Sequence, residues 1–67
     1  MNVEEIKKAM EEGEEVCWVN KGYKVIKDEI GQYFIMCMHN EYCIGLTWRD
    51  GKTLNGREEQ FFINRIF

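Results

Sequence analysis

Two thiols and the only imidazole of the chain fall within one short segment, and a third thiol lies upstream. Cys37, His39 and Cys43 could ligate zinc, with Cys17 as the fourth ligand, because zinc prefers four thiolate or imidazole ligands in a tetrahedron. The segment lacks the paired Cys-x-x-Cys knuckles of a structural zinc site, and buried cysteines commonly serve as small apolar side chains. We therefore expect no bound metal and no cofactor. The alternative is a zinc site formed by these four residues.

A cysteine near a histidine could also act as a nucleophile, since a neighbouring base lowers the pKa of a catalytic thiol. The sequence marks no third group that would orient the imidazole, and His39 falls in a predicted turn. Acidic pairs such as Glu58-Glu59 could perform acid–base chemistry only in a pocket that separates the pKa values of the two carboxyls. The sequence therefore does not favour an enzyme.

Four glutamates crowd the carboxyl end of the predicted N-terminal helix: Glu11, Glu12, Glu14 and Glu15. The helix macrodipole disfavours negative charge at that end. We hypothesise that these residues form a binding face for a basic partner protein. The alternative is a patch that only keeps the chain soluble.

Basic residues stand beside aromatic ones at Tyr23-Lys24 and at Trp48-Arg49. On one sheet face, such residues could form a stacking platform for single-stranded nucleic acid. The formal net charge of −3 argues against a binder that relies mainly on attraction to phosphates. A small sheet also needs large aromatic side chains in its core, so we expect Tyr23 and Trp48 to pack there. Nucleic-acid binding is kept as the alternative function.

The elements that must position these residues begin with a helix over residues 2–12. Asn2 can accept a hydrogen bond from the backbone of Glu5, whose carboxylate can reach back, as in a capping box. Apolar residues then recur at helical spacing. Gly13 is a natural stop, because glycine adopts the left-handed conformation without a side-chain clash.

Short runs rich in β-branched and aromatic residues follow, and predict strands over residues 15–19, 23–28, 32–38, 42–49 and 60–64. The third run is apolar on both faces, which predicts a place at the centre of the sheet. Asp50-Gly51 and Asn55-Gly56 are pairs that favour tight turns. We expect the first pair to close a hairpin and the second to redirect the chain.

The register of the hairpin around His39 decides which side chains share a face. A three-residue loop over residues 39–41 would set Cys37 opposite Cys43, whereas a two-residue loop over residues 40–41 would place them on opposite faces. We favour the three-residue loop, because it gathers the large apolar residues of both strands, including Met36 and Trp48, on one face.

Together these elements predict one α+β domain over residues 1–67, in which an N-terminal helix packs on an antiparallel β-meander of four or five strands. A chain of this length builds only a small core. The apolar C-terminal residues must dock in that core or on another copy. Docking on another copy would make a homodimer through Phe61, Phe62, Ile66 and Phe67.

The location expected for this chain is a reducing cytoplasm. Three cysteines cannot all pair within one chain, whereas secreted disulfide scaffolds usually carry an even number. The sequence also contains neither a signal peptide nor an apolar run of the roughly 18 residues that a membrane span needs.

Several segments carry a resemblance that covers nearly the whole chain. They are Trp18-Val19-Asn20, Gly22-Tyr23, Gly31-Gln32-Tyr33, Ile44-Gly45-Leu46-Thr47-Trp48, Asp50-Gly51, Leu54-Asn55-Gly56 and Phe61-Phe62-Ile63. With these segments the chain resembles small uncharacterised proteins encoded by phages, prophages and other mobile elements of bacteria. The resemblance implies a compact helix-plus-sheet protein without known catalytic residues. It also makes inhibition of a bacterial host or defence protein a natural role.

The sequence thus favours a non-enzymatic module that binds another protein, either a bacterial host protein or a second copy of itself. The acidic helix end or an exposed edge of the sheet would make the contact.

Overall fold

The computed structural model describes residues 1–65 of the 67-residue chain. Its single helix, α1 (Val3–Glu11), begins where the sequence predicts a capping box. Asn2 Oδ1 accepts a hydrogen bond from Glu5 N at 2.8 Å, and Glu5 Oε1 accepts one from Asn2 N at 3.0 Å, so the predicted box is confirmed. Gly13 follows the helix with φ of 86°, a left-handed conformation that suits glycine. Among these residues, no helix combines the length and apolar composition that crossing a bilayer requires.

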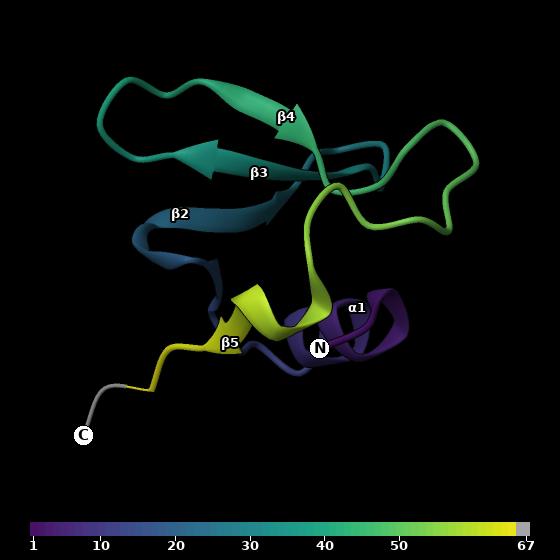
Figure 1. Ribbon diagram of the computed structural model, residues 1–67, viewed down its shortest axis with the longest axis horizontal. Coiled ribbons are helices and arrows are strands. Elements are labelled where there is room, and N and C mark those ends of the chain that lie inside the picture. Colours follow the sequence, from purple (N-terminus) through teal and green to yellow (C-terminus); the bar gives the residue numbers. More distant parts are fainter. Residues whose placement is uncertain (66–67) are drawn as a thin grey trace.

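Five strands form one antiparallel sheet (Figure 1). They are β1 (Val16–Trp18), β2 (Asn20–Lys27), β3 (Tyr33–Cys37), β4 (Cys43–Gly45) and β5 (Phe61–Ile63), and a short 3-10 turn, η1 (Glu58–Gln60), precedes the last. The order across the sheet is β4-β3-β2-β1-β5. The first four strands form a meander, and β5 crosses back to pair with β1. This is the predicted α+β class, with the helix packed against the sheet.

The strand predicted over residues 42–49 is much shorter, because β4 ends at Gly45. Leu46 then turns inward and is buried. The following residues form a wide loop, in which Thr47 bridges to Leu54 and Trp48 N donates to Thr53 O at 2.8 Å. Asp50 holds this loop together, since its carboxylate accepts hydrogen bonds from the backbone of Lys52 and from both the backbone and the hydroxyl of Thr53. The chain does fold back at Asp50-Gly51, but within a larger loop than a two-residue hairpin.

The preferred register around His39 is wrong. Met36, not Cys37, lies opposite Cys43, and the turn is closed by Cys37 N donating to Tyr42 O and Glu41 N donating to Cys37 O, both at 2.8 Å. Glu41 adopts a left-handed φ of 58°, which the longer loop from Met38 to Glu41 requires. Both faces of β3 carry apolar residues, so hydrophobic alternation alone could not fix the register.

The sheet has two unlike faces, because neighbouring residues of a strand point to opposite sides and cross-strand partners share a side. The inner face packs on α1 and carries the core, which comprises Ile6, Ala9, Val16, Val25, Ile35, Leu46 and Phe61. The outer face points away from α1. It carries Cys17, Lys24, Ile26, Phe34, Met36, Cys43 and Phe62. Cys17 is fully buried, whereas the other six neither belong to the core cluster nor pack against it.

A matched pair of isoleucines tests this division. Ile35 on the inner face is 2% exposed, so Ile35→Ala is expected to lower the free energy of unfolding by about 2–5 kcal/mol. Ile26 on the outer face is half-buried, so Ile26→Ala should cost clearly less. Urea unfolding of both variants checks the difference, with Ile35→Val replacing the alanine variant if that variant does not fold. Equal losses would show that both faces are covered in the folded chain.

Candidate functional site

The residues considered for a metal site do not converge. Cys17 and Cys43 lie on the outer face, separated by β2 and β3, whereas Cys37 belongs to the inner face. His39 lies exposed in the loop after β3. Within residues 1–65, no three His, Cys, Asp or Glu side chains are grouped so that they could hold a metal ion. Burial raises the pKa of the Cys17 thiol, which disfavours the reactive thiolate.

Two of the four clustered glutamates have partners within the chain. Lys24 Nζ lies 2.7 Å from Glu15 Oε1, and Asn64 Nδ2 donates to Glu15 Oε2 at 2.6 Å. These hydrogen bonds lower the pKa of Glu15, with Lys24 making the larger contribution. Glu14 forms a longer ion pair with Arg65, with 3.8 Å between Oε2 and Nε. The exposed remainder of the predicted acidic face is Glu11 and Glu12.

The predicted aromatic and basic face is split by the fold. Tyr23 points to the inner face and meets Trp18 edge-on, with ring centroids 5.4 Å apart. Lys24, the next residue, points to the outer face. Trp48 and Arg49 belong to the loop after β4, so the four residues do not share a surface.

The expectation that Trp48 anchors the core is wrong, because its side chain is 65% exposed. Trp18 packs against the core instead, and its Nε1 donates to Gln60 Oε1 at 3.2 Å. The misassignment follows from the early end of β4. Past Leu46 the chain leaves the sheet, so strand alternation no longer determines where Trp48 points.

The proposed dimer residues are also divided. Phe61 is buried in the core and cannot serve as a surface contact. Phe62 points to the outer face and is half-buried. Ile66 and Phe67 lie outside the described residues.

The outer face is the largest change from the sequence-based expectation, and we take it as the candidate site. One row of neighbouring residues crosses all five strands, comprising Cys43, Met36, Lys24, Cys17 and Phe62. A shorter row beside it comprises Gly45, Phe34 and Ile26. Lys24 is the only charged side chain in the two rows, and its ion pair with Glu15 neutralises it.

This composition is unusual for a sheet that is covered on one side only. Antiparallel sheets commonly alternate between apolar residues on the packed face and polar residues on the solvated face. Here Ile26, Phe34, Met36 and Phe62 are half-buried, and within residues 1–65 no helix or second sheet packs over them. The doubly apolar run at residues 32–38 was the signal for this face. From the sequence alone, that run predicts a central strand.

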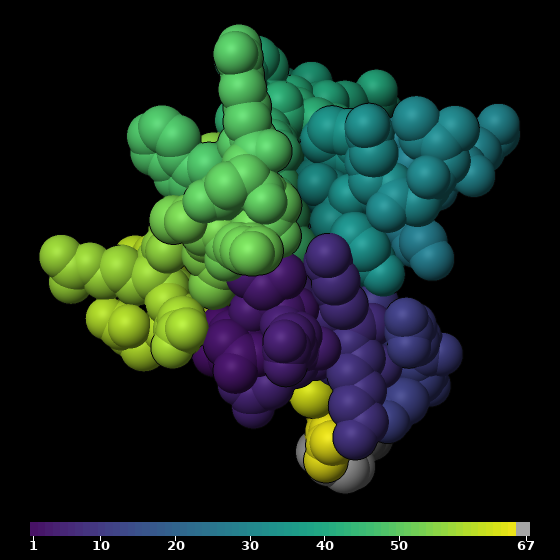
Figure 2. Space-filling view, turned by 90° about the vertical axis from the view of Figure 1, so that its right-hand side faces the viewer, coloured from purple at the N-terminus to yellow at the C-terminus, as the bar shows by residue number. Residues whose placement is uncertain are grey.

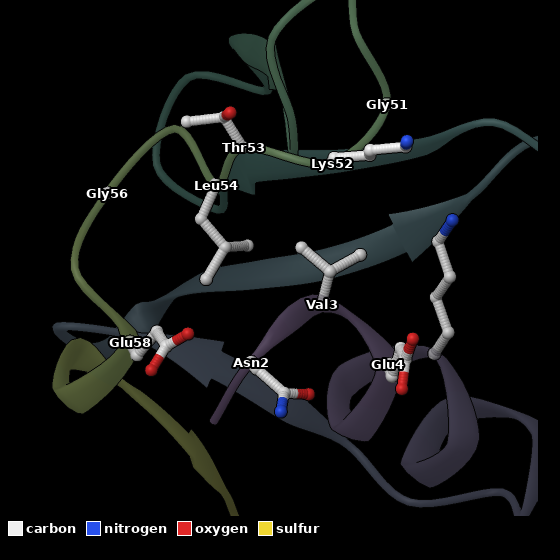
Figure 3. Close-up of a pocket in the computed structure, with 10 residues that line it drawn as sticks. Asn2, Val3, Glu4, Gly51, Lys52, Thr53, Leu54, Gly56 and Glu58 are labelled. Atoms are coloured by element: carbon white, nitrogen blue, oxygen red, sulfur yellow. The ribbon is translucent and has the colours of Figure 1, made fainter.

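A groove lies between the start of α1 and the loop at residues 51–58. These two segments, purple and light green in Figure 2, lie next to each other. It has a volume of about 740 Å³. Val3 and Leu54 point toward each other across it, and Glu4 and Glu58 lie apart at its rim (Figure 3). Both carboxylates are exposed, so the groove does not bring them together as a pair for acid–base chemistry.

Comparison of the chain with models of protein families, with curated proteins and with solved structures finds no match.

The pairing of Glu15 predicts a specific pH dependence. A carboxyl whose pKa is lowered by folding adds stability above its unfolded pKa and loses that stability as the pH falls through the folded value. The difference in unfolding free energy between the wild type and Glu15→Gln should therefore hold above the ordinary value of 4.5 and shrink below it. Urea unfolding from neutral pH to about pH 3 measures this difference.

The control is Glu12→Gln, because Glu12 makes no ion pair within residues 1–65. A difference for Glu15→Gln that does not change with pH, or that matches the control at every pH, would contradict the assigned hydrogen bonds.

Proposed function

We propose that the chain is a non-enzymatic protein-interaction module that binds another protein through the outer face of its sheet. The observation that carries this proposal is the apolar surface formed by Ile26, Phe34, Met36 and Phe62. Contiguous apolar patches on small proteins commonly mark interaction sites. Lys24 lies within one row, between Met36 and Cys17, and its ion pair with Glu15 leaves no net charge for a partner to compensate.

The shape of the surface favours a protein over a small ligand. Pockets for small molecules are concave and enclose most of the ligand. Three grooves within residues 1–65 lie mainly on other surfaces, although Phe34 and Gly45 of the outer face border one of them. A sheet face suits the apolar side of a helix or another sheet. We therefore expect the partner to present a row of aliphatic or aromatic side chains.

The free energy gained by burying the outer face indicates how large the interface with a partner must be. Full burial of a large apolar side chain contributes about 1.5–3 kcal/mol, and no more than about a third of each of these four residues is still exposed, so covering them contributes at most roughly 2–4 kcal/mol. Association itself costs about 4–15 kcal/mol. The outer face alone therefore cannot hold a stable complex, and the partner must also contact the polar groups beside it. Glu11 and Glu12 remain available to a basic part of the same partner.

The resemblance to proteins of phages and other mobile elements leads us to propose a bacterial host protein as this partner, met in the cytoplasm. Inhibition of a host or defence protein is the role that this proposal favours.

A double variant tests the surface. Ile26→Thr with Met36→Thr makes the outer face more polar and places β-branched threonines in both strands, which suits strand structure. Ile30→Thr with Met38→Thr is matched in residue type and lies in the turns, where both side chains are exposed. Quantitative pull-down from bacterial lysate should recover a protein with the wild type and the control but lose it with the outer-face variant. Calorimetry with that purified protein should then show affinity weakened by about tenfold or more.

Folding of both variants is checked by circular dichroism before binding is compared. Recovery of the same proteins by all three forms of the chain would contradict the proposal. A dimer of the chain, seen by sedimentation and abolished only by the outer-face variant, would replace the host protein by a second copy.

A further inference from the structure

Trp48 is an exposed indole on an ordered turn. Its side chain is 65% exposed, although burial of a tryptophan is among the largest apolar contributions available to a small protein. The backbone around it is held by Trp48 N donating to Thr53 O at 2.8 Å and Gly51 N donating to Trp48 O at 3.0 Å. The fold therefore presents this ring to solvent from a hydrogen-bonded turn.

The indole borders a groove of about 340 Å³, within the range typical of small-molecule sites. One wall is the turn and start of β3, with Gln32 and Tyr33, and the other is the loop after β4, with Thr47, Trp48 and Arg49. Lys7 of α1 reaches the same groove. We call it the Trp48 groove.

The Trp48 groove is positively charged. Two cationic side chains, Lys7 and Arg49, line it, and no carboxylate does. Neither cation forms an ion pair within residues 1–65. Lys7 Nζ lies 5.3 Å from the centre of the Tyr33 ring. The ammonium group of Lys7 therefore lies beside the wall of the groove that Tyr33 forms. The nearby Asp50 carboxylate instead accepts the hydrogen bonds that close its own turn.

We propose that the Trp48 groove binds a nucleotide, with the base stacked on Trp48 and the phosphate held between Arg49 and Lys7. Every base offers a flat face to an aromatic ring, and guanidinium and ammonium groups bind phosphate oxygens. The amide of Gln32 and the hydroxyl of Thr47 provide hydrogen bonds for the polar edges of the ligand. The nucleotide is either free or part of a single strand.

The net charge of the chain limits how this binding can work. A chain of formal charge −3 repels a polyanion at long range, so the attraction must come from stacking and from the two local cations. Contact to one phosphate of a single strand gives a slope of about −0.7 in log affinity against log salt, far shallower than that of a basic nucleic-acid binder.

The test is a titration monitored by fluorescence anisotropy of a labelled short oligothymidylate and, in a second arm, by calorimetry with thymidine monophosphate. Trp48→Leu is expected to weaken binding by about tenfold or more. The matched control is Tyr42→Leu, because Tyr42 is 68% exposed in the β3–β4 loop, outside the groove. Arg49→Gln and Lys7→Gln should each weaken binding and make the salt slope shallower, whereas Lys21→Gln should change affinity by less than about twofold.

Tighter binding of the oligothymidylate than of the monophosphate assigns the groove to single strands, and equal affinity assigns it to free nucleotides. Lack of binding of either probe at low salt would overturn the proposal. So would equal losses in Arg49→Gln and Lys21→Gln, which would indicate unspecific attraction. These variants avoid Phe34 and Gly45, which also belong to the outer face, so the result is separable from the test of protein binding.

Discussion

One helix can cover only one face of a five-stranded sheet, and the rest of this molecule follows from that limit. Ile6 and Ala9 of α1 are buried against the inner face, where Leu46 and Phe61 help to close the core. Within residues 1–65 there is no second α-helix to place on the other side. Apolar residues on the outer face must therefore remain partly accessible or be covered by something else.

The strands nevertheless carry apolar residues on that face. Phe34 and Met36 flank the buried Ile35 on β3, so one strand has large apolar side chains on both sides. Cys17 is fully buried although it points to the outer side, because Lys24 and Phe62 lie on either side of it. The ion pair between Lys24 and Glu15 keeps this surface uncharged in a chain that is acidic as a whole.

Local chemistry was enough to predict the class of the fold. The Asn2–Glu5 capping box has a short-range cause, and so does the stop at Gly13. The doubly apolar run predicts a strand at the centre of the sheet; β3 is an interior strand between β2 and β4, but the central strand is β2. The strand register and the strand ends depend on pairing between strands, and local sequence did not predict them. The hairpin register at Cys37 was wrong because both registers bury apolar residues, and Trp48 was misplaced because nothing local shows that β4 ends at Gly45.

The candidate surfaces were as hard to predict from the sequence as the strand pairing, because they also depend on contacts between distant residues. The sequence suggested cysteines, glutamates and aromatic–basic pairs as candidate site residues because of their side-chain chemistry. The fold separates most of these groups. It instead forms surfaces from residues that are distant in sequence, such as Met36 beside Lys24 on the outer face and Lys7 near Arg49 in the Trp48 groove. Each surface combines at least two elements, so a single stretch of sequence, such as the doubly apolar run at residues 32–38, shows only part of it.

The central claim is that the outer face is apolar and open to solvent in the free chain. Paramagnetic relaxation of methyl groups by an inert, water-soluble gadolinium chelate measures this directly, at a protein concentration low enough to exclude self-association. The account predicts strong relaxation of the methyl groups of Ile26 and Met36 and weak relaxation of those of Ile6 and Ile35. Protection of Ile26 and Met36 equal to that of Ile35 would contradict it, because some part of the chain would then already cover that face.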